Sequence, residues 1–254
     1  MRSLMKEREI DAFKYLLDDT QSFHRLLDKT EKEDVLSYYE KHIYIDSDFV
    51  PIACAKHIVH DQFLAKYKRD ISRADKIFDI LQKWEFIPIQ NCNILDLGCG
   101  YGVFISRWKD KQYGHGCGIE LSPLAKQISP IAGSIRIGDV NRIDHLPIPE
   151  DISLVVAFDI IEHLFDVRHV LQTIFRKTSP ELKVLIEIPI VRPGIDDKSL
   201  ASYKYFYPTR HLHLYTRCGI ERTISECGFK ILKSELLKDG NKYLMLMEKD
   251  NKNV

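Results

Sequence analysis

The segment 93–102, with the sequence NILDLGCGYG, is the feature that most constrains the fold of this chain. A short apolar run ends in a turn that contains Gly98, Gly100 and Gly102, and a helix-like stretch follows it. Glycines at the end of a strand let the chain turn tightly and let a ligand approach the backbone without obstruction by Cβ atoms. The segment therefore predicts an α/β fold with a ligand at the carboxyl end of this strand.

Short apolar runs alternate with helix-like stretches after residue 93, which predicts βαβ units and a parallel sheet. We expect strands at 93–97, 116–120, 134–138, 153–158 and 183–188, and helices at 102–110, 122–132, 167–178 and 217–227. Two final runs, Phe229 to Leu236 and Tyr243 to Glu248, flank an Asp-Gly turn signal and predict an antiparallel pair at the sheet edge. The expected fold class is a Rossmann-like, doubly wound α/β fold with a seven-stranded, mostly parallel sheet.

The first 70 residues are expected to form an N-terminal helical cap or lid, and residues 71–254 the ligand-binding domain. The spacing of the apolar residues in this first region fits a helical period, as shown by Ile10, Phe13, Leu16 and Leu17. This pattern predicts a set of short helices.

Two capping signatures predict where helices begin. One is Thr30-x-x-Glu33, and the other is Ser72-x-x-Asp75. The second should open a helix that packs its apolar stripe against the sheet. That stripe comprises Ala74, Ile77, Phe78, Leu81 and Trp84.

Acidic residues mark three successive predicted strands. Asp96 lies in the first strand, Glu120 ends the second 22 positions after Gly98, and Asp139 follows the third. A carboxylate at the end of the second strand accepts ribose hydroxyls in Rossmann-like folds. A ligand with a zwitterionic amino-acid end would place its ammonium toward Asp96 and its carboxylate near the amides of the glycine turn. SAM (S-adenosylmethionine) is such a ligand.

The glycine spacing does not match two other nucleotide-binding motifs. A G-x-G-x-x-G pattern that starts at Gly98 needs glycine at position 103, where the chain has Val103. The turn is also not followed by a Walker lysine, so the sequence gives no support for a P-loop.

These segments together resemble the class I SAM-dependent methyltransferases, in the small-molecule branch with type 11 or type 23 domains. Segment 93–102 resembles motif I of that family, and the strand ends at Glu120 and Asp139 match its later cofactor motifs. DIIEHL at 159–164 resembles the family's signature after the fourth strand, and HLHLYT at 211–216 resembles its late segment. The resemblance covers roughly residues 70–248.

The resemblance implies that SAM is the cofactor and S-adenosylhomocysteine the coproduct. It implies methyl transfer to an oxygen, or a nitrogen, of a small-molecule acceptor, with a sugar or surface-glycan precursor as one candidate. The residues expected to contact SAM are Asp96, Gly98, Cys99, Gly100, Glu120, Leu121, Asp139, Val140 and Phe158. Cys99 is interpreted as a small turn residue and not as a nucleophile.

His163, His211 and His213 are the candidate catalytic residues. Imidazole titrates near neutrality, so it can take a proton from an acceptor hydroxyl or amine. His211 and His213 alternate along an extended segment and should point to the same face. A structural role for each histidine is an open alternative.

Asp159, Glu162 and His163 could converge on a divalent cation, because residues three and four apart share a helix face and this set of ligands suits magnesium, manganese or iron. Some ubiquinone-pathway O-methyltransferases, which the chain resembles here, use an acid-x-x-Glu-His cluster with metal. Because the Glu-His pair also occurs in metal-free relatives, we favour a structural interpretation in which Asp159 caps the helix. We therefore expect no metal.

The chain has 37 basic and 37 acidic residues, a formal net charge of zero. Such a chain has no overall field that would recruit nucleic acid or an anionic membrane, which favours a small-molecule partner. We see neither a signal peptide nor a run of the roughly 18 apolar residues needed to span a bilayer, so the expected location is the cytoplasm.

Two other functions stay open. A catalytically idle SAM-binding or scaffold protein would keep the glycine turn and Glu120 but would need no base. A nicotinamide-dependent oxidoreductase is disfavoured by Val103, which interrupts the dinucleotide motif.

Overall fold

The computed structural model describes residues 5–45, 48–86, 91–237 and 240–250, with side chains described outside 40–64. Its contacts divide the chain into two compact units. Unit 1 comprises Met1–Val35 and Ala157–Val254, and unit 2 comprises Leu36–Val156. The expected division after residue 70 falls inside a helix and stays a prediction.

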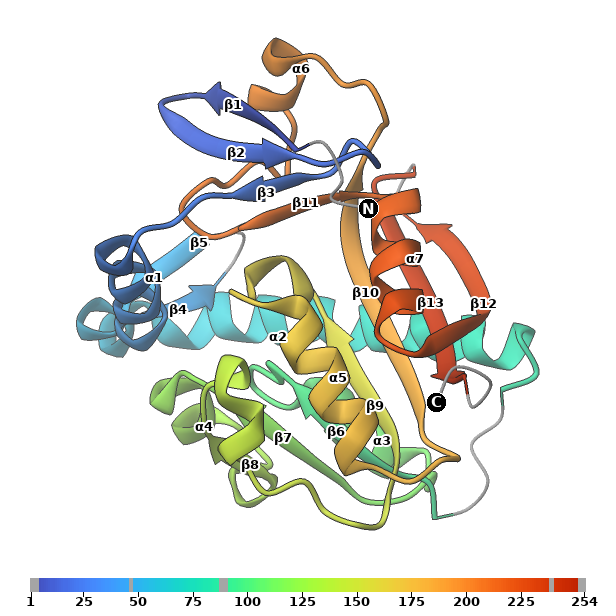
Figure 1. Cartoon of the computed structure of the whole chain (residues 1–254). Helices are drawn as coiled ribbons and strands as arrows, with labels where there is room; N and C mark the ends of the chain where they lie inside the picture. The colour runs from blue at the N-terminus through green and yellow to red at the C-terminus, as the bar shows by residue number, and fades with distance from the viewer. Residues whose placement is uncertain (1–4, 46–47, 87–90, 238–239, 251–254) are drawn as a thin grey trace. The chain divides into compact units, whose positions relative to one another are not determined.

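Unit 2 contains the first predicted parallel strands. Parallel pairing joins β6 (Asn93–Leu97) to β7 (Gly116–Glu120) and β7 to β8 (Ile135–Ile137), as Figure 1 shows. β9 (Ile152–Phe158), which runs on into unit 1, follows β6 in the strand order. β6 is buried over most of its length, as expected of a parallel strand covered on both faces. The other elements of this unit are β4 (His42–Ile45), β5 (Asp48–Pro51), α2 (Ile52–Lys83), α3 (Val103–Asp110), α4 (Pro123–Ile128), η1 (Ala132–Ser134) and η2 (Val140–His145).

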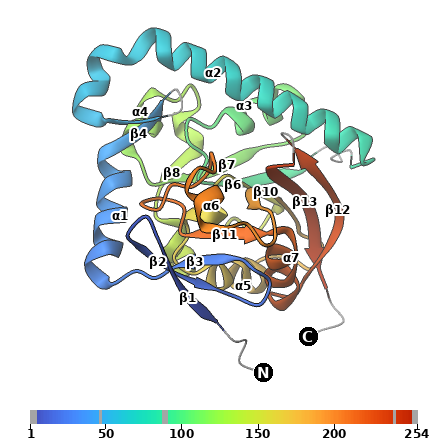
Figure 2. The ribbon, with the colours of Figure 1, turned by 90° about the horizontal axis from the view of Figure 1, so that it is seen from above.

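The apolar stripe predicted for residues 74–84 is confirmed on α2. Its five residues are all buried, and the Phe78 ring stacks on that of Phe104 in α3 with centroids 5.0 Å apart. Figure 2 shows α2 running alongside α3. No helix in the described ranges is long and apolar enough to cross a membrane.

Unit 1 contains a mostly antiparallel sheet in the order β1-β2-β3-β11-β10-β13-β12. The strands are β1 (Lys6–Ile10), β2 (Phe13–Leu17), β3 (Phe23–Arg25), β10 (Lys183–Val191), β11 (His213–Thr216), β12 (Phe229–Leu237) and β13 (Lys242–Lys249). Its helices are η3 (Ile161–His163), α5 (Val167–Lys177), α6 (Asp197–Ala201) and α7 (Arg217–Glu226). The predicted antiparallel pair at the end of the chain is confirmed as β12 and β13.

All seven strands predicted after residue 93 are present, namely β6 to β10, β12 and β13, and the four predicted helices lie between them. This succession is that of a mixed α/β, Rossmann-like fold with a central, mostly parallel sheet. The predicted fold class is confirmed in this respect.

The prediction of helices over residues 10–17 is wrong. Asp11 and Ala12 have φ angles of 50° and 63°, and they form a two-residue turn between β1 and β2. A turn with two positive φ angles matches the twist of a hairpin. The chain pairs as strands because Ile10 and Tyr15 become buried in a cluster with Leu214, which is far away in the sequence.

The two capping signatures also need correction. α1 (Lys29–Lys41), which begins in unit 1, is opened by Asp28 and Glu31. The Glu31 amide donates to Asp28 Oδ1 at 2.9 Å, and the Asp28 amide donates to Glu31 Oε2 at 3.0 Å. The capping box therefore lies two residues before the predicted one at Thr30. Ser72 opens no helix, because α2 has already started at Ile52.

A buried hydroxyl network joins the N-terminal strands of unit 1 to α7. Thr216 caps α7 by accepting from the Gly219 amide at 3.1 Å, and its hydroxyl donates to the Thr20 carbonyl at 2.8 Å. The Ser22 hydroxyl accepts from the Thr216 amide at 3.0 Å. A Cβ added at Gly219 would lie 2.0 Å from Ser22 Oγ, so only glycine fits there.

Replacement of Thr216 by valine keeps the shape of the side chain but removes the cap and leaves the Thr20 carbonyl without this donor. We expect Thr216→Val to lower the free energy of unfolding by about 1–3 kcal/mol, measured by urea denaturation. Ser202→Ala is the control, since this exposed hydroxyl bonds only to carbonyls of its own turn. Equal stability of the two variants would contradict a structural role for the network.

Candidate functional site

The glycine turn of unit 2 leaves open space beside one of its glycines. Gly98, Gly100 and Gly102 have φ angles of 68°, 54° and 74°, which side chains rarely adopt. A Cβ added at Gly102 would lie 2.5 Å from the Ile131 side chain, whereas one added at Gly100 would meet nothing within 4 Å. Gly102 is therefore favoured by its φ angle and by the nearby Ile131 side chain, and Gly100 borders a space that a ligand can occupy.

Glu120 is fixed beside this turn by backbone amides. Its Oε2 accepts from the Gly100 amide at 2.9 Å, and its Oε1 accepts from the Ser122 amide at 2.8 Å. Burial raises the pKa of Glu120, and these amide hydrogen bonds oppose the rise. The Leu121 amide bonds this carboxylate as well, and since a carboxylate offers about four lone pairs, Glu120 can still accept a ribose hydroxyl.

Asp96 is a second acidic group in the same turn region and is only 3% exposed. Burial, followed by the nearby charge of Glu120, raises the pKa of Asp96 well above its ordinary value, while Arg73 lowers it. A cationic ligand would stabilise both ionised carboxylates. SAM carries an ammonium and a sulfonium, so the residues at this site fit that cofactor.

The remaining predicted cofactor residues of unit 2 lie on the same strand ends. Asp139 follows β8 and caps η2 by accepting from the Asn141 amide at 2.9 Å, and Val140 is the first residue of η2. Leu121 directly follows Glu120 at the end of β7. Burial raises the pKa of the Cys99 thiol well above its usual range, which argues against a nucleophilic thiolate. These residues provide the strand-end arrangement expected from the sequence.

Unit 1 contains a buried ion triad that sequence analysis missed. Phe158, a predicted cofactor residue, ends β9, and Asp159 after it has a φ angle of 54°. Lys242 Nζ, on β13, binds both carboxylate oxygens of Asp159 and lies 2.8 Å from Glu187 Oε1. Lys242 and Glu187 are 2% and 1% exposed, so this ammonium neutralises the Glu187 carboxylate out of contact with water, while the Asp159 side chain is 32% exposed. A single lysine in a strand gives no sequence signal for such a role.

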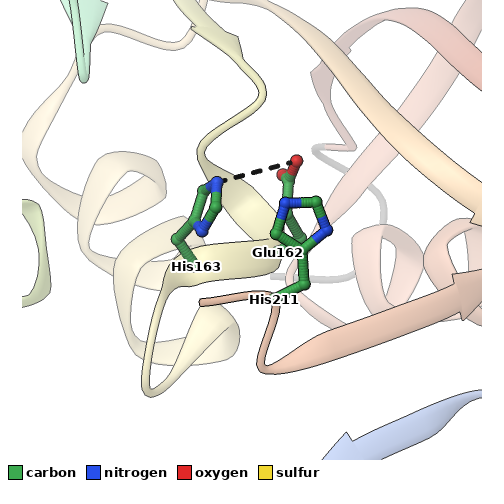
Figure 3. A group of neighbouring side chains, drawn as sticks. All are labelled: Glu162, His163 and His211. Carbon is green, nitrogen blue, oxygen red and sulfur yellow. Dashed lines mark ion pairs between the residues drawn. The ribbon is translucent and has the colours of Figure 1, made fainter. Parts of the chain in front are cut away.

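A second cluster in unit 1 brings together Glu162, His163 and His211 (Figure 3). The rings of His163 and His211 have centroids 4.7 Å apart at an interplanar angle of 82°. His163 Nε2 lies 3.9 Å from Glu162 Oε1, while the other ring nitrogen, Nδ1, donates to the Arg210 carbonyl at 2.9 Å. Two of the three predicted catalytic histidines therefore belong to one cluster with a buried carboxylate.

Burial sets the protonation state of both rings in this cluster. It lowers the pKa of His163 to about 4, although the hydrogen bond to the Arg210 carbonyl and the charge of Asp159 act in the opposite direction. Burial and the neighbouring His163 lower the pKa of His211 well below its ordinary value. Both rings are therefore neutral at pH 7.

His213 lies in a different network, so the expectation that it shares a face and a role with His211 does not match the geometry. Its Nδ1 is 3.0 Å from His24 Nδ1, and its Nε2 donates to the Leu164 carbonyl at 2.9 Å. Asp18 continues the chain of contacts at 3.2 Å from His24 Nε2. Burial would raise the pKa of Asp18, but hydrogen bonds from His24 and Thr20 hold it below its ordinary value. Both nitrogens of His213 are thus engaged by the protein.

Removal of the Lys242 ammonium would leave the buried Glu187 carboxylate, and the partly exposed Asp159 carboxylate, without this cation. We expect Lys242→Met to lower the free energy of unfolding by about 3–5 kcal/mol, measured by urea denaturation. Lys230→Met is the matched control, since Lys230 lies on the neighbouring strand β12 but its ion pair with Glu248 is half exposed. A Lys242 variant as stable as the Lys230 variant would contradict this account of the triad.

Comparisons with known proteins agree with the geometry. A family model described as a methyltransferase domain matches residues 56–234, which is more than half of the chain. A search of curated proteins gives no significant match.

Solved structures show the same fold. The chain is similar to geranyl diphosphate C-methyltransferase from Streptomyces coelicolor A3(2), solved with Mg²⁺, geranyl diphosphate and S-adenosyl-L-homocysteine, at 12% identity and a TM-score of 0.61 over 88% of this chain and 100% of that one. It is similar to a SAM-dependent methyltransferase from Mesorhizobium loti at 18% identity and a TM-score of 0.50 over 65% and 94% of the two chains. A third similar structure is that of the mitomycin 7-O-methyltransferase MmcR, at 14% identity and a TM-score of 0.49. The alignment covers 63% of this chain, which spans about half, 49%, of that protein. The family match and the shared fold give the conclusion that the chain belongs to the methyltransferase-domain family and is a class I SAM-dependent methyltransferase.

Proposed function

We propose that this methyltransferase transfers the methyl group of SAM to an oxygen, or a nitrogen, of a small-molecule acceptor. The observation that carries the proposal is the cluster of Glu162, His163 and His211, which gathers neutral imidazoles and a carboxylate that can act on an acceptor proton. The zero net charge supports a small acceptor over nucleic acid. The cytoplasmic location and the sugar or surface-glycan precursor expected from the sequence are kept as parts of this proposal.

Methyl transfer needs little covalent help from the protein, because the sulfonium of bound SAM is already an activated leaving group. The work of this chain is to hold the cofactor and the acceptor in line and to manage the acceptor proton. We assign the first task in unit 2 to Asp96, Gly100 and Glu120. We assign the proton to the cluster in unit 1 and not to His213, whose two nitrogens already bond to His24 and Leu164.

The rival functions predict different binding behaviour. An idle SAM-binding or scaffold protein would bind SAM but form no S-adenosylhomocysteine with any acceptor. A nicotinamide oxidoreductase would bind NAD in preference to SAM. A calorimetric comparison of SAM with NAD, followed by a screen of alcohols, phenols, amines and sugars for S-adenosylhomocysteine formation, separates all three functions.

Loss of the Glu120 carboxylate removes charged hydrogen bonds to the ribose that are worth roughly 1.5–3 kcal/mol each. We expect Glu120→Ala to weaken SAM affinity by at least about tenfold, measured by titration calorimetry. Glu150→Ala is the control, because this exposed acid of unit 2 lies in the turn before the amino end of β9, and the cofactor residues follow the carboxyl ends of their strands. Unchanged affinity in the Glu120 variant would remove this residue from the cofactor site.

Replacement of His211 by asparagine removes an imidazole that acts on the acceptor but leaves the cofactor residues of unit 2 intact. With an acceptor found in the screen, we expect His211→Asn to lower kcat by about 100-fold or more, with SAM affinity within about twofold of the wild type. His145→Asn, at an exposed histidine, should behave like the wild type.

The proposal for the cluster would fail if His211→Asn and His163→Asn each kept kcat within about threefold of the wild type, a barrier change under about 1 kcal/mol. Methyl transfer would then rest on positioning alone or on an acceptor that arrives already ionised.

A further inference from the structure

We propose that Glu162, His163 and His211 bind a divalent first-row transition-metal cation of the zinc, iron or cobalt type. Each of the three residues offers one ligand atom, and these atoms all lie within 4.8 Å of one another in the described part of the chain. The inference goes beyond methyl transfer, because binding of the cation alone can be measured without SAM or an acceptor.

The hydrogen bonds of His163 leave a lone pair facing the cluster. Nδ1 donates its proton to the Arg210 carbonyl at 2.9 Å, so Nε2 of the neutral ring carries the lone pair. That nitrogen is the one 3.9 Å from Glu162 Oε1 (Figure 3). A backbone carbonyl that fixes the tautomer and orientation of a ligating imidazole is the usual arrangement around protein-bound metals.

His211 supplies the second nitrogen. Its side chain is buried, at 8% exposure, and its Nδ1 has no hydrogen-bond partner within the described ranges. The ring is held by a backbone hydrogen bond at Tyr205, which leaves the Nδ1 lone pair available. A buried ring nitrogen with no hydrogen bond is costly unless a ligand satisfies it.

Charge and burial favour a cation at this position. Glu162 is 0% exposed, so its carboxyl group lies away from water beside the two histidine rings, where a cation would compensate the cost of its burial. Neutral imidazole is the form that binds metal.

The ligand set differs from the acid-x-x-Glu-His cluster considered from the sequence. The Asp159 carboxylate is held by Lys242, and His211, from the segment before β11, takes the third position. Two imidazoles and one carboxylate suit zinc, iron or cobalt, whereas magnesium and calcium prefer oxygen ligands alone. If the proposed function holds, such a cation would bind the acceptor oxygen and lower its pKa.

Cobalt(II) titration tests the site directly. Full-length protein stripped with a chelator should bind about one equivalent of Co²⁺ with a visible ligand-field spectrum, and Zn²⁺ should displace it. Glu162→Gln and His211→Ala should each weaken Co²⁺ affinity by at least about tenfold. His24→Ala is the matched control, because His24 is a partly buried histidine of unit 1 outside the cluster, and it should keep wild-type affinity.

Circular dichroism spectra show whether the variants are folded. Their SAM affinity should also stay at the wild-type value, because the cofactor residues lie in unit 2 and are unchanged. The proposal is overturned if the wild type binds neither Co²⁺ nor Zn²⁺ with a Kd below about 100 µM. It is also overturned if the folded Glu162 and His211 variants bind Co²⁺ as tightly as the His24 variant. Metal binding without any methyl transfer would contradict the proposed function alone, and methyl transfer by a wild-type protein that binds neither Co²⁺ nor Zn²⁺ would contradict this inference alone.

Discussion

Unit 1 depends on one buried ammonium. Lys242 on β13 binds Asp159 and Glu187, and the Asp159 amide also donates to the Glu187 carbonyl at 3.0 Å. Together these contacts hold Asp159 at a φ angle of 54°, a conformation that is unfavourable for a residue other than glycine. Glu162 and His163 follow within one turn of chain, so their positions depend on this ion triad.

The parts of the fold that rest on local signals were predictable from the sequence. A strand that ends in a glycine turn and the apolar stripe of α2 are both properties of short segments, and both are observed. The hairpin of β1 and β2 was not predictable, because the spacing of Ile10 and Phe13 fits a helical period and a two-residue turn equally well. The Asp11-Ala12 turn lacks the glycine that usually marks such hairpins. Pairing of β3 with β11 then joins residues 189 positions apart, for which a single sequence gives no signal.

The residues of the candidate site also divide into those that local sequence signals predict and those that such signals do not predict. Asp96 and Glu120 were found because the ends of parallel strands meet at one edge of a sheet, so order and spacing along the chain imply proximity. His211 and His213 were grouped because residues two apart share a face in a strand. β11 begins only at His213, so His211 lies before the strand and reaches His163, while His213 turns to His24. Lys242 was missed because burial of a lysine is rare and requires partners that no local pattern specifies.

Burial of the histidines of unit 1 keeps their rings neutral, which is the form that binds a metal. Burial lowers the pKa of His163 to about 4 and that of His213 to about 3, below the usual value of 6.5. Because the unfolded chain binds protons more readily than these buried rings, acid destabilises this unit as the pH falls below about 6.5. A cation at Glu162, His163 and His211 would compete with protons for the same two lone pairs, so it would stabilise the neutral rings and oppose this effect. Desolvation therefore keeps the imidazole nitrogens unprotonated, and their lone pairs lie beside the Glu162 carboxyl group, where a cation can bind all three side chains.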